Sequence, residues 1–275
     1  MNGRPLSSLC ALVYSLVLFC GAVSQAQVRT GLVQSANPDN QALLVGVTYG
    51  LPGIDLDIAN MKAIAENASY QLKPTTLWEA EGNVANTAQH LTDLSKASGK
   101  EGTFLFYFSG HGSSGSILLE DMEMQVKDIR TAIEAGRKGL TPLARLVLMF
   151  DSCYSGSLLD PFRRGISLDG ILTPEMRTAL LADNVVSEFT GTNRAKKKYW
   201  DNLFVFASSR ADETSLASDA GSIFTLALVK GFTEVATANG TVGDFVAKTQ
   251  AYTEGHHPVA RLVPTTLEKE PLLLH

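Results

Sequence analysis

Cys153 and His111 are the residues of this sequence best suited to nucleophilic chemistry, and each follows a strongly apolar segment. Cys153 comes directly after "LVLMFDS" (146–152), and His111 lies near the end of "GTFLFYFSGHG" (102–112). The thiolate form of a cysteine is the nucleophile, and a nearby imidazole can take the thiol proton and stabilise the charge. Together the two side chains could attack an acyl carbon and form a covalent thioester.

Glycines surround both residues. Gly110 and Gly112 flank His111, and Gly156 lies just beyond Cys153. Glycine lets the backbone turn sharply, and backbone N–H groups in such turns can stabilise a developing oxyanion. Taken singly, the cysteine could be a small buried hydrophobic residue and the histidine a hydrogen-bonded core residue. The pairing of the two favours catalysis over both structural interpretations.

The N-terminus has the layout of a secretory signal peptide. Arg4 precedes the apolar run "LCALVYSLVLFC" (9–20), which is followed by the small-residue stretch "GAVSQAQ" (21–27). The apolar run is short for a membrane span, and the small residues fit cleavage after Ala26. We therefore expect residues 1–26 to be removed and the mature protein to be exported, periplasmic or secreted, with no stable membrane span.

The cysteine count bears on the same question. The chain has three cysteines, Cys10, Cys20 and Cys153, and the first two lie in the predicted signal peptide. A retained anchor, or a lipoprotein attached through Cys20, is the alternative, although Phe19 is bulkier than lipoprotein signals prefer. In the mature protein Cys153 would have no intramolecular disulfide partner. A single leftover cysteine in an exported protein indicates a reactive or intermolecular thiol.

The composition is typical of a globular protein. Of the 275 residues, 45% are hydrophobic and 19% are charged, which argues against a disordered chain or a coiled coil. The net charge is −5, and no basic stripe dominates the chain, so nucleic acid is not an expected partner. We expect residues 27–275 to form a single domain.

The elements that must position the candidate residues alternate between strand and helix. Continuous apolar runs predict buried strands, and apolar residues at helical spacing predict helices. The predicted strands are 42–47, 75–78, 102–112, 144–150, 202–209 and an edge strand at 258–263. The predicted helices are 54–70, 83–97, 127–139, 222–236 and 242–252, and 116–124 could form a small hairpin. This alternation predicts an α/β fold, with a mainly parallel sheet of roughly six strands and helices on both faces.

The order of the strands decides whether His111 and Cys153 can meet. The chain between them is long enough for a hairpin, a helix and a return strand. A right-handed crossover places the two preceding strands close together, and functional loops of such sheets gather at the carboxyl ends of the strands. We therefore expect both side chains at the same edge of the sheet.

Several segments also resemble the caspase-like cysteine peptidases, specifically the metacaspase and bacterial caspase-homologue branch. "YFSGHG" (107–112) resembles the histidine motif of that family, and "DSCYSG" (151–156) resembles its cysteine motif. Further similar segments are "LLVGVTYGLPGIDLDIANM" (43–61), "VFASSRADETSLAS" (205–218) and "SIFTLALVKGF" (222–232). The resemblance covers about residues 41–265 and implies a caspase-like three-layer sandwich.

The resemblance implies a role for each matching residue. Cys153 corresponds to the nucleophile and His111 to the general acid/base. The backbone N–H of Gly112, with that of Cys153, corresponds to the oxyanion hole. The family therefore predicts a cysteine endopeptidase that acts on peptides or proteins.

The same resemblance implies a preference for Arg or Lys before the scissile bond. Asp57 and Asp151 match the acids of the primary pocket, and Ser109 matches a polar pocket residue. Carboxylates facing a guanidinium make strong charge-assisted hydrogen bonds. Three alternatives remain open: Asp151 could cap a helix that begins near Ser152, Asp57 could be a solvated helix residue, and Asp55 could be the pocket acid in a shifted register.

The sequence also departs from the family. Ile54 stands where many metacaspases have cysteine, and "EDMEM" (120–124) is a thin counterpart of their acid-rich calcium-binding segment. We therefore expect no required cofactor, and Ca²⁺ activation is not supported by the sequence. His256 and His257 are adjacent but lack acids or thiols at ligand spacing, so we expect no metal site.

The region that follows the cysteine motif, residues 157–199, holds several basic residues. We expect a large-subunit-like part to about residue 157, a connecting region at 157–199 and a small-subunit-like part at 200–275. The connecting region holds "FRR" (162–164) and "RAKKK" (194–198), which an enzyme specific for basic residues could cut in itself.

Two other functions remain open at this stage. One is a weak or inactive caspase-like scaffold that binds peptides or partners, and the other is a peptidase of this clan with acidic or Asn specificity. A serine hydrolase is not expected, because the sequence contains no G-x-S-x-G motif. The sequence does not predict an oligomeric state.

Overall fold

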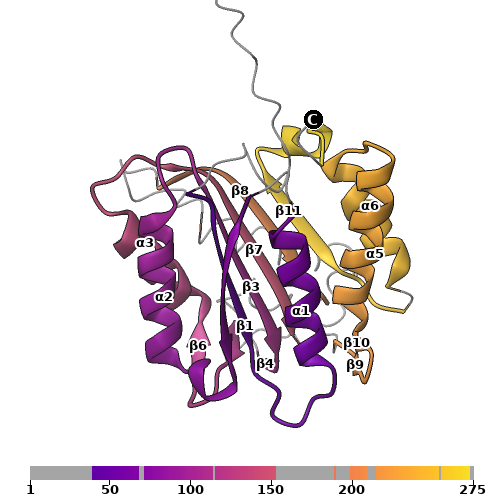
Figure 1. The fold of residues 1–275 in the computed structure, drawn as a ribbon, viewed down its shortest axis with the longest axis horizontal. Helices are drawn as coiled ribbons and strands as arrows, with labels where there is room; N and C mark the ends of the chain where they lie inside the picture. The colour runs from indigo at the N-terminus through magenta and orange to yellow at the C-terminus, as the bar shows by residue number, and fades with distance from the viewer. Residues whose placement is uncertain are drawn as a thin grey trace, which may run out of the picture.

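Figure 1 shows the fold in a computed structural model of the chain. The structure describes residues 39–67, 71–113, 115–152, 189, 199–209, 215–253 and 255–272. The predicted signal peptide, Cys153 and nearly all of the predicted connecting region lie outside these described residues.

A six-stranded sheet forms the centre of the fold. Its strand order is β11-β8-β7-β3-β1-β2. All neighbouring strands are parallel except β11, which runs antiparallel to β8 at one edge. The strands are β1 (Gln41–Gly46), β2 (Lys73–Trp78), β3 (Thr103–Gly110), β7 (Leu143–Ser152), β8 (Trp200–Ala207) and β11 (Val259–Val263). The predicted α/β class and mainly parallel sheet are confirmed.

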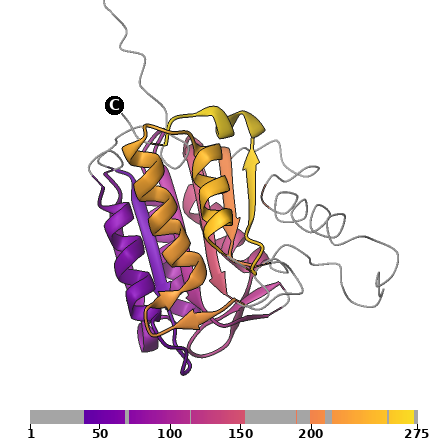
Figure 2. The same cartoon turned by 90° about the vertical axis from the view of Figure 1, so that its right-hand side faces the viewer.

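Helices cover both faces of this sheet, which gives three layers (Figures 1 and 2). One face packs against α2 (Val84–Ala97) and α3 (Val126–Arg137). The other face packs against α1 (Ile54–Ala65), α5 (Ile223–Thr237) and α6 (Val242–Tyr252). Short 3-10 helices occur at Glu79–Glu81 (η1) and Thr265–Lys269 (η3).

The central strands are mostly apolar because both of their faces are covered. Every residue of β3 and β7 is buried. Along β3, Phe106 and Phe108 pack into the core on the side of α2 and α3, whereas Tyr107 packs on the side of α1 and α5. Since side chains alternate along a strand, Ser109 at the end of β3 lies on the same face as Tyr107. By the same alternation Asp151 lies on the face of Met149, which packs with α1 and α5.

The boundaries of most predicted elements differ from the structure by a few residues, as at one helix and one strand near the candidate site. The predicted helix at 54–70 ends at Ala65. The predicted strand at 102–112 ends at Gly110, whose φ is +154° and whose position leaves no room for a Cβ, because that atom would lie 2.6 Å from the carbonyl oxygen of Val47. Glycine at this position therefore allows the chain to leave the sheet immediately before His111.

Two small antiparallel units flank the carboxyl end of the sheet. The predicted hairpin at 116–124 is present as β5 (Ser116–Leu118) and β6 (Glu123–Gln125), joined by a third strand, β4 (Gly112–Ser113). The second unit pairs β9 (Ala217–Ser218) with β10 (Gly221–Ser222). The sequence did not predict β4, β9 or β10.

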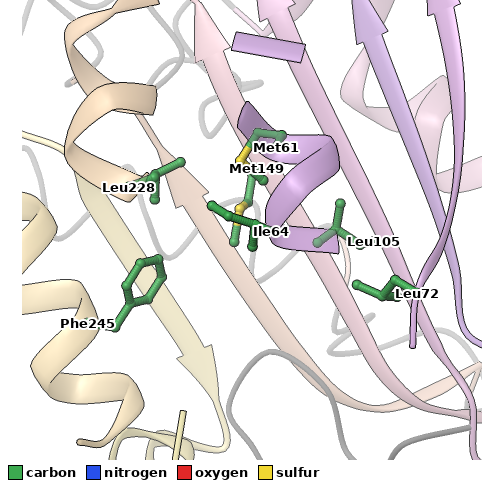
Figure 3. A pocket seen from close by; sticks show the side chains of 7 residues that line it. All are labelled: Met61, Ile64, Leu72, Leu105, Met149, Leu228 and Phe245. Atoms are coloured by element: carbon green, nitrogen blue, oxygen red, sulfur yellow. The ribbon is translucent and has the colours of Figure 1, made fainter. Parts of the chain in front are cut away.

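A cavity lies in the core between the sheet and the helices α1, α5 and α6 (Figure 3). Its lining side chains are all apolar: Met61, Ile64, Leu72, Leu105, Met149, Leu228 and Phe245. An apolar lining offers no group to orient a peptide, and such voids remain dry. We therefore assign the cavity to core packing rather than to substrate binding.

Candidate active site

The strands that precede His111 and Cys153 are neighbours in the sheet. In the parallel register of β3 and β7, Ser109 is the partner of Asp151 and Gly110 is the partner of Ser152. His111 is the next residue after Gly110, and Cys153 is the next residue after Ser152. The expected return of the chain to a neighbouring parallel strand is confirmed, whereas Cys153 itself lies outside the described residues.

The backbone on either side of His111 is fixed by the hairpin that follows it. The carbonyl oxygen of His111 accepts a hydrogen bond from the N–H of Leu118 at 2.9 Å. Gly112 begins β4 and pairs with Ile117. The imidazole is partly exposed, and its ring centroid lies 6.5 Å from that of Tyr49. His111 is therefore a partly accessible side chain on a firmly held backbone.

Asp57 lies in the first turn of α1 and is completely buried. Its Oδ2 accepts hydrogen bonds from the hydroxyls of Ser109, at 2.8 Å, and Ser222. Its Oδ1 accepts the backbone N–H of Ser222 at 2.8 Å. Asp55 is exposed, so the alternative that Asp55 replaces Asp57 through a shifted register does not hold.

Asp151 is the penultimate residue of β7 and is 2% exposed. Its Oδ1 accepts the Ser215 hydroxyl at 2.9 Å, and its Oδ2 accepts the Thr225 hydroxyl at 2.7 Å. The Thr225 hydroxyl also lies 2.6 Å from that of Tyr107. Because Ser152 continues the strand and the carboxylate is bound by these hydroxyls, Asp151 does not cap a helix beginning at Ser152.

The two carboxyl groups form an electrostatically coupled pair. Burial, followed by the negative charge of Asp57, raises the pKa of Asp151 to about 7, against the lowering effect of hydrogen bonds from Thr225 and Ser215. Burial also raises the pKa of Asp57, while its hydrogen bonds with Ser222 and Ser109 lower it. A buried acid pair of this kind favours either a shared proton or a bound cation. A guanidinium or ammonium group could supply that positive charge.

The structure therefore brings together three of the residues predicted for the pocket. Ser109 bonds directly to Asp57 and is the cross-strand partner of Asp151. The sequence did not predict the hydroxyl groups of Tyr107, Ser215, Ser222 and Thr225, which complete the network around the acids. Ser222 lies 165 residues from Asp57 along the chain, and no spacing rule connects positions so far apart.

A family model described as the caspase domain matches residues 39–264. The chain belongs to the caspase-domain family. The resemblance noted in the sequence is confirmed, and the fold is the scaffold of a cysteine peptidase.

Solved structures that share this fold include the following two proteins. Protein GSU0716 from Geobacter sulfurreducens is 18% identical, with a TM-score of 0.58 over 86% of this chain and 99% of that one. Caspase-1 from Spodoptera frugiperda is 11% identical, with a TM-score of 0.54 over 86% of this chain and 92% of that one. At these identities the similarity establishes the fold alone. No curated protein matches the sequence.

Two further findings concern metals and membranes. Among the residues that the structure describes, no group of three or more His, Cys, Asp or Glu side chains could hold a metal ion. Within the same part of the chain, no helix is both long and apolar enough to cross a membrane.

Proposed function

We propose that this protein is an exported cysteine endopeptidase that cleaves peptide bonds after Arg or Lys. The observation that carries this proposal is the buried pair Asp57 and Asp151, at the sheet edge where β3 leads into His111 and β7 leads toward Cys153. Two carboxylates in a low-dielectric site bind a cationic side chain through charge-assisted hydrogen bonds.

The proposed reaction uses His111 as the proton carrier. The imidazole takes the thiol proton of Cys153, and the sulfur attacks the carbonyl carbon of the scissile bond. The backbone N–H groups of Gly112 and Cys153 stabilise the resulting oxyanion. The protonated His111 then gives its proton to the departing amine, which leaves a thioester on Cys153. Water, deprotonated by His111, hydrolyses the thioester and restores the thiol.

The primary pocket must open before a basic side chain can enter. Each of the four carboxylate oxygens of Asp57 and Asp151 already accepts a hydrogen bond. Ser215 and Ser222 supply some of these bonds from a segment that also carries the β9–β10 hairpin. We propose that a guanidinium displaces these hydroxyls and that the segment moves outward as the substrate binds.

The deciding experiment is a cleavage profile of the mature chain, residues 27–275, on a peptide library. We expect cleavage after Arg and Lys, none after Asp or Asn, and none by a Cys153→Ala variant. Measurement with and without Ca²⁺ tests the expectation that no cofactor is required. Cleavage after acidic residues or Asn would contradict the proposed specificity. An unreactive Cys153 thiol together with no cleavage of any peptide would favour a binding scaffold.

We also propose self-processing and export. The basic segments at 162–164 and 194–198 fit the proposed specificity. Purified wild-type protein should show fragments cut within 157–199, and Cys153→Ala should stay intact; equal fragmentation of both would mean that another protease cuts the chain. N-terminal sequencing of the exported protein should begin at Gln27.

A further inference from the structure

Tyr49 occupies a tight turn that its own side chain does not favour. The N–H of Leu51 donates to the carbonyl oxygen of Thr48 at 2.8 Å. The two central residues have positive φ values, 41° at Tyr49 and 86° at Gly50. Positive φ at both central positions is the geometry of a type I′ turn, in which Asn, Asp or Gly is preferred. Gly50 suits its position, whereas a tyrosine at the first position is strained.

Contacts from a distant part of the chain hold Tyr49 in this conformation. Its hydroxyl donates to the carbonyl oxygens of Leu119, at 3.2 Å, and Glu120. Both acceptors belong to the segment between β5 and β6. Strained backbone persists where surrounding contacts fix it, and such positions gather at functional sites. The turn alone therefore does not explain why a tyrosine occupies this position, and the contacts of its side chain must be considered.

The Tyr49 ring lies against the His111 ring. The ring centroids are 6.5 Å apart, with an angle of 50° between the planes, which is within the range of aromatic contacts. The backbone of His111 is hydrogen-bonded to Leu118, and the hydroxyl of Tyr49 is hydrogen-bonded to the carbonyl oxygens of Leu119 and Glu120. One short segment, residues 118–120, therefore fixes both the His111 backbone and the ring beside its side chain.

This segment and the residue after it are hydrogen-bonded to the chain at the start of α2. The N–H of Glu120 donates to the carbonyl oxygen of Gly82 at 3.0 Å. Oδ1 of Asp121 accepts the N–H of Val84, the first residue of α2, at 2.9 Å. The position of the Tyr49 ring is thus set by contacts that reach the start of α2 and not by its own loop alone.

We propose that Tyr49 is a positioning residue for the imidazole of His111. Its ring limits the orientations that the imidazole can adopt, so that a ring nitrogen faces first the Cys153 thiol and then the departing amine. The inference rests on the proposed peptidase function, because it assigns His111 the role of proton carrier. Small displacements of a catalytic group lower rates strongly, whereas binding of the basic side chain depends on the separate acid pair.

The test separates positioning from stability by using Tyr49→Asn. Asparagine accepts positive φ, so the turn should keep or gain stability, and the melting temperature should not fall. The value of kcat should fall about 10- to 100-fold, with KM changed less than about twofold and the basic limb of the kcat/KM pH profile displaced. Tyr49→Phe, which keeps the ring but loses the hydroxyl anchor, should lie between Tyr49→Asn and wild type.

Gln71→Asn provides a matched control. Gln71 also has a positive φ, 53°, and it precedes β2 at the amino end of the sheet, opposite the candidate site. This variant should leave kcat unchanged. The positioning role would be overturned if Tyr49→Asn had the same kcat as the wild type. It would also be overturned if kcat and the melting temperature fell together without a change in the pH profile.

A second readout does not depend on peptidase activity. In a Cys153→Ala background with isotopically labelled histidine, NMR should show that Tyr49→Asn moves the His111 ring resonances and that Gln71→Asn does not. Unmoved His111 resonances would overturn the inference even in an active enzyme. A clear movement, in a protein whose wild type cleaves no peptide, would support the contact and count against the proposed function instead.

Discussion

Replacing Asp151 with Asn removes one charge from the acid pair while keeping the shape of the side chain. Asp151 accepts hydroxyl hydrogen bonds from Ser215 and Thr225, and both hydroxyls can turn to suit an amide. A hydrogen bond to a charged group is worth about 1.5–3 kcal/mol. At about 1.4 kcal/mol per factor of ten, kcat/KM for an Arg substrate should fall roughly 10- to 150-fold.

The same substitution should stabilise the folded protein at alkaline pH. Burial raises the pKa of Asp151 from 3.8 to about 7. Between these values the unfolded chain is ionised at this site while the folded chain keeps the proton, so stability falls as the pH rises through this window and stays low above it. Since one pKa unit is worth about 1.4 kcal/mol, a rise from 3.8 to about 7 gives a loss of at most about 4 to 5 kcal/mol. Asp151→Asn removes this loss.

Two measurements check the reasoning together. Urea unfolding of wild type and Asp151→Asn should give a more stable variant at pH 8 and nearly equal stabilities at pH 4. Peptide assays at pH 8 should show the loss on an Arg substrate but not on a Gln substrate. The reasoning is refuted if the variant keeps kcat/KM for Arg within about twofold of wild type, or if its stability advantage does not depend on pH.

Two other substitutions test the pocket and the core. Asp57→Asn should reduce kcat/KM for Arg substrates about as strongly as Asp151→Asn, whereas the exposed Asp55 can be changed to Asn with no effect; equal losses in both would show that local charge, not the buried pair, selects the substrate. Gly46→Ala would place its Cβ 2.7 Å from Cγ1 of Ile58 and 2.8 Å from Cζ3 of Trp78. It should cost about 1–3 kcal/mol of unfolding free energy in urea, and unchanged stability would mean that this face of β1 is looser than described.

The sheet could be predicted from the sequence because its strands are buried on both faces. A strand covered by helices on both sides must be apolar at successive positions, and segments such as 144–150 carry that signal without reference to any partner. The edge strand β11 was also predicted, and its burial is mixed: Val259 and Leu262 are buried, whereas its other three residues are only partly buried. The two-residue strands β4, β9 and β10 are too short to show a period of any kind.

The candidate site was predictable in its acids but not in its supporting groups. Asp57, Ser109 and Asp151 could be assigned because they stand in motifs at strand or helix ends. Apart from Ser109, the hydroxyls that bind the acids come from residues 64 to 165 positions away, and serine and threonine carry no signal of such partners in a single sequence. The role of Tyr49 was not predicted for a different reason. The segment "TYGLPG" predicts a loop, but the backbone strain at Tyr49 and the contact of Tyr49 with His111 appear only in three dimensions.

The most direct test of the account is a crystal structure of the mature protein inactivated by a peptidyl-Arg chloromethyl ketone. We expect a thioether bond on Cys153, a ring nitrogen of His111 beside the adduct, and the guanidinium between Asp57 and Asp151. An unmodified Cys153, or an arginine side chain directed away from the two carboxylates, would contradict it.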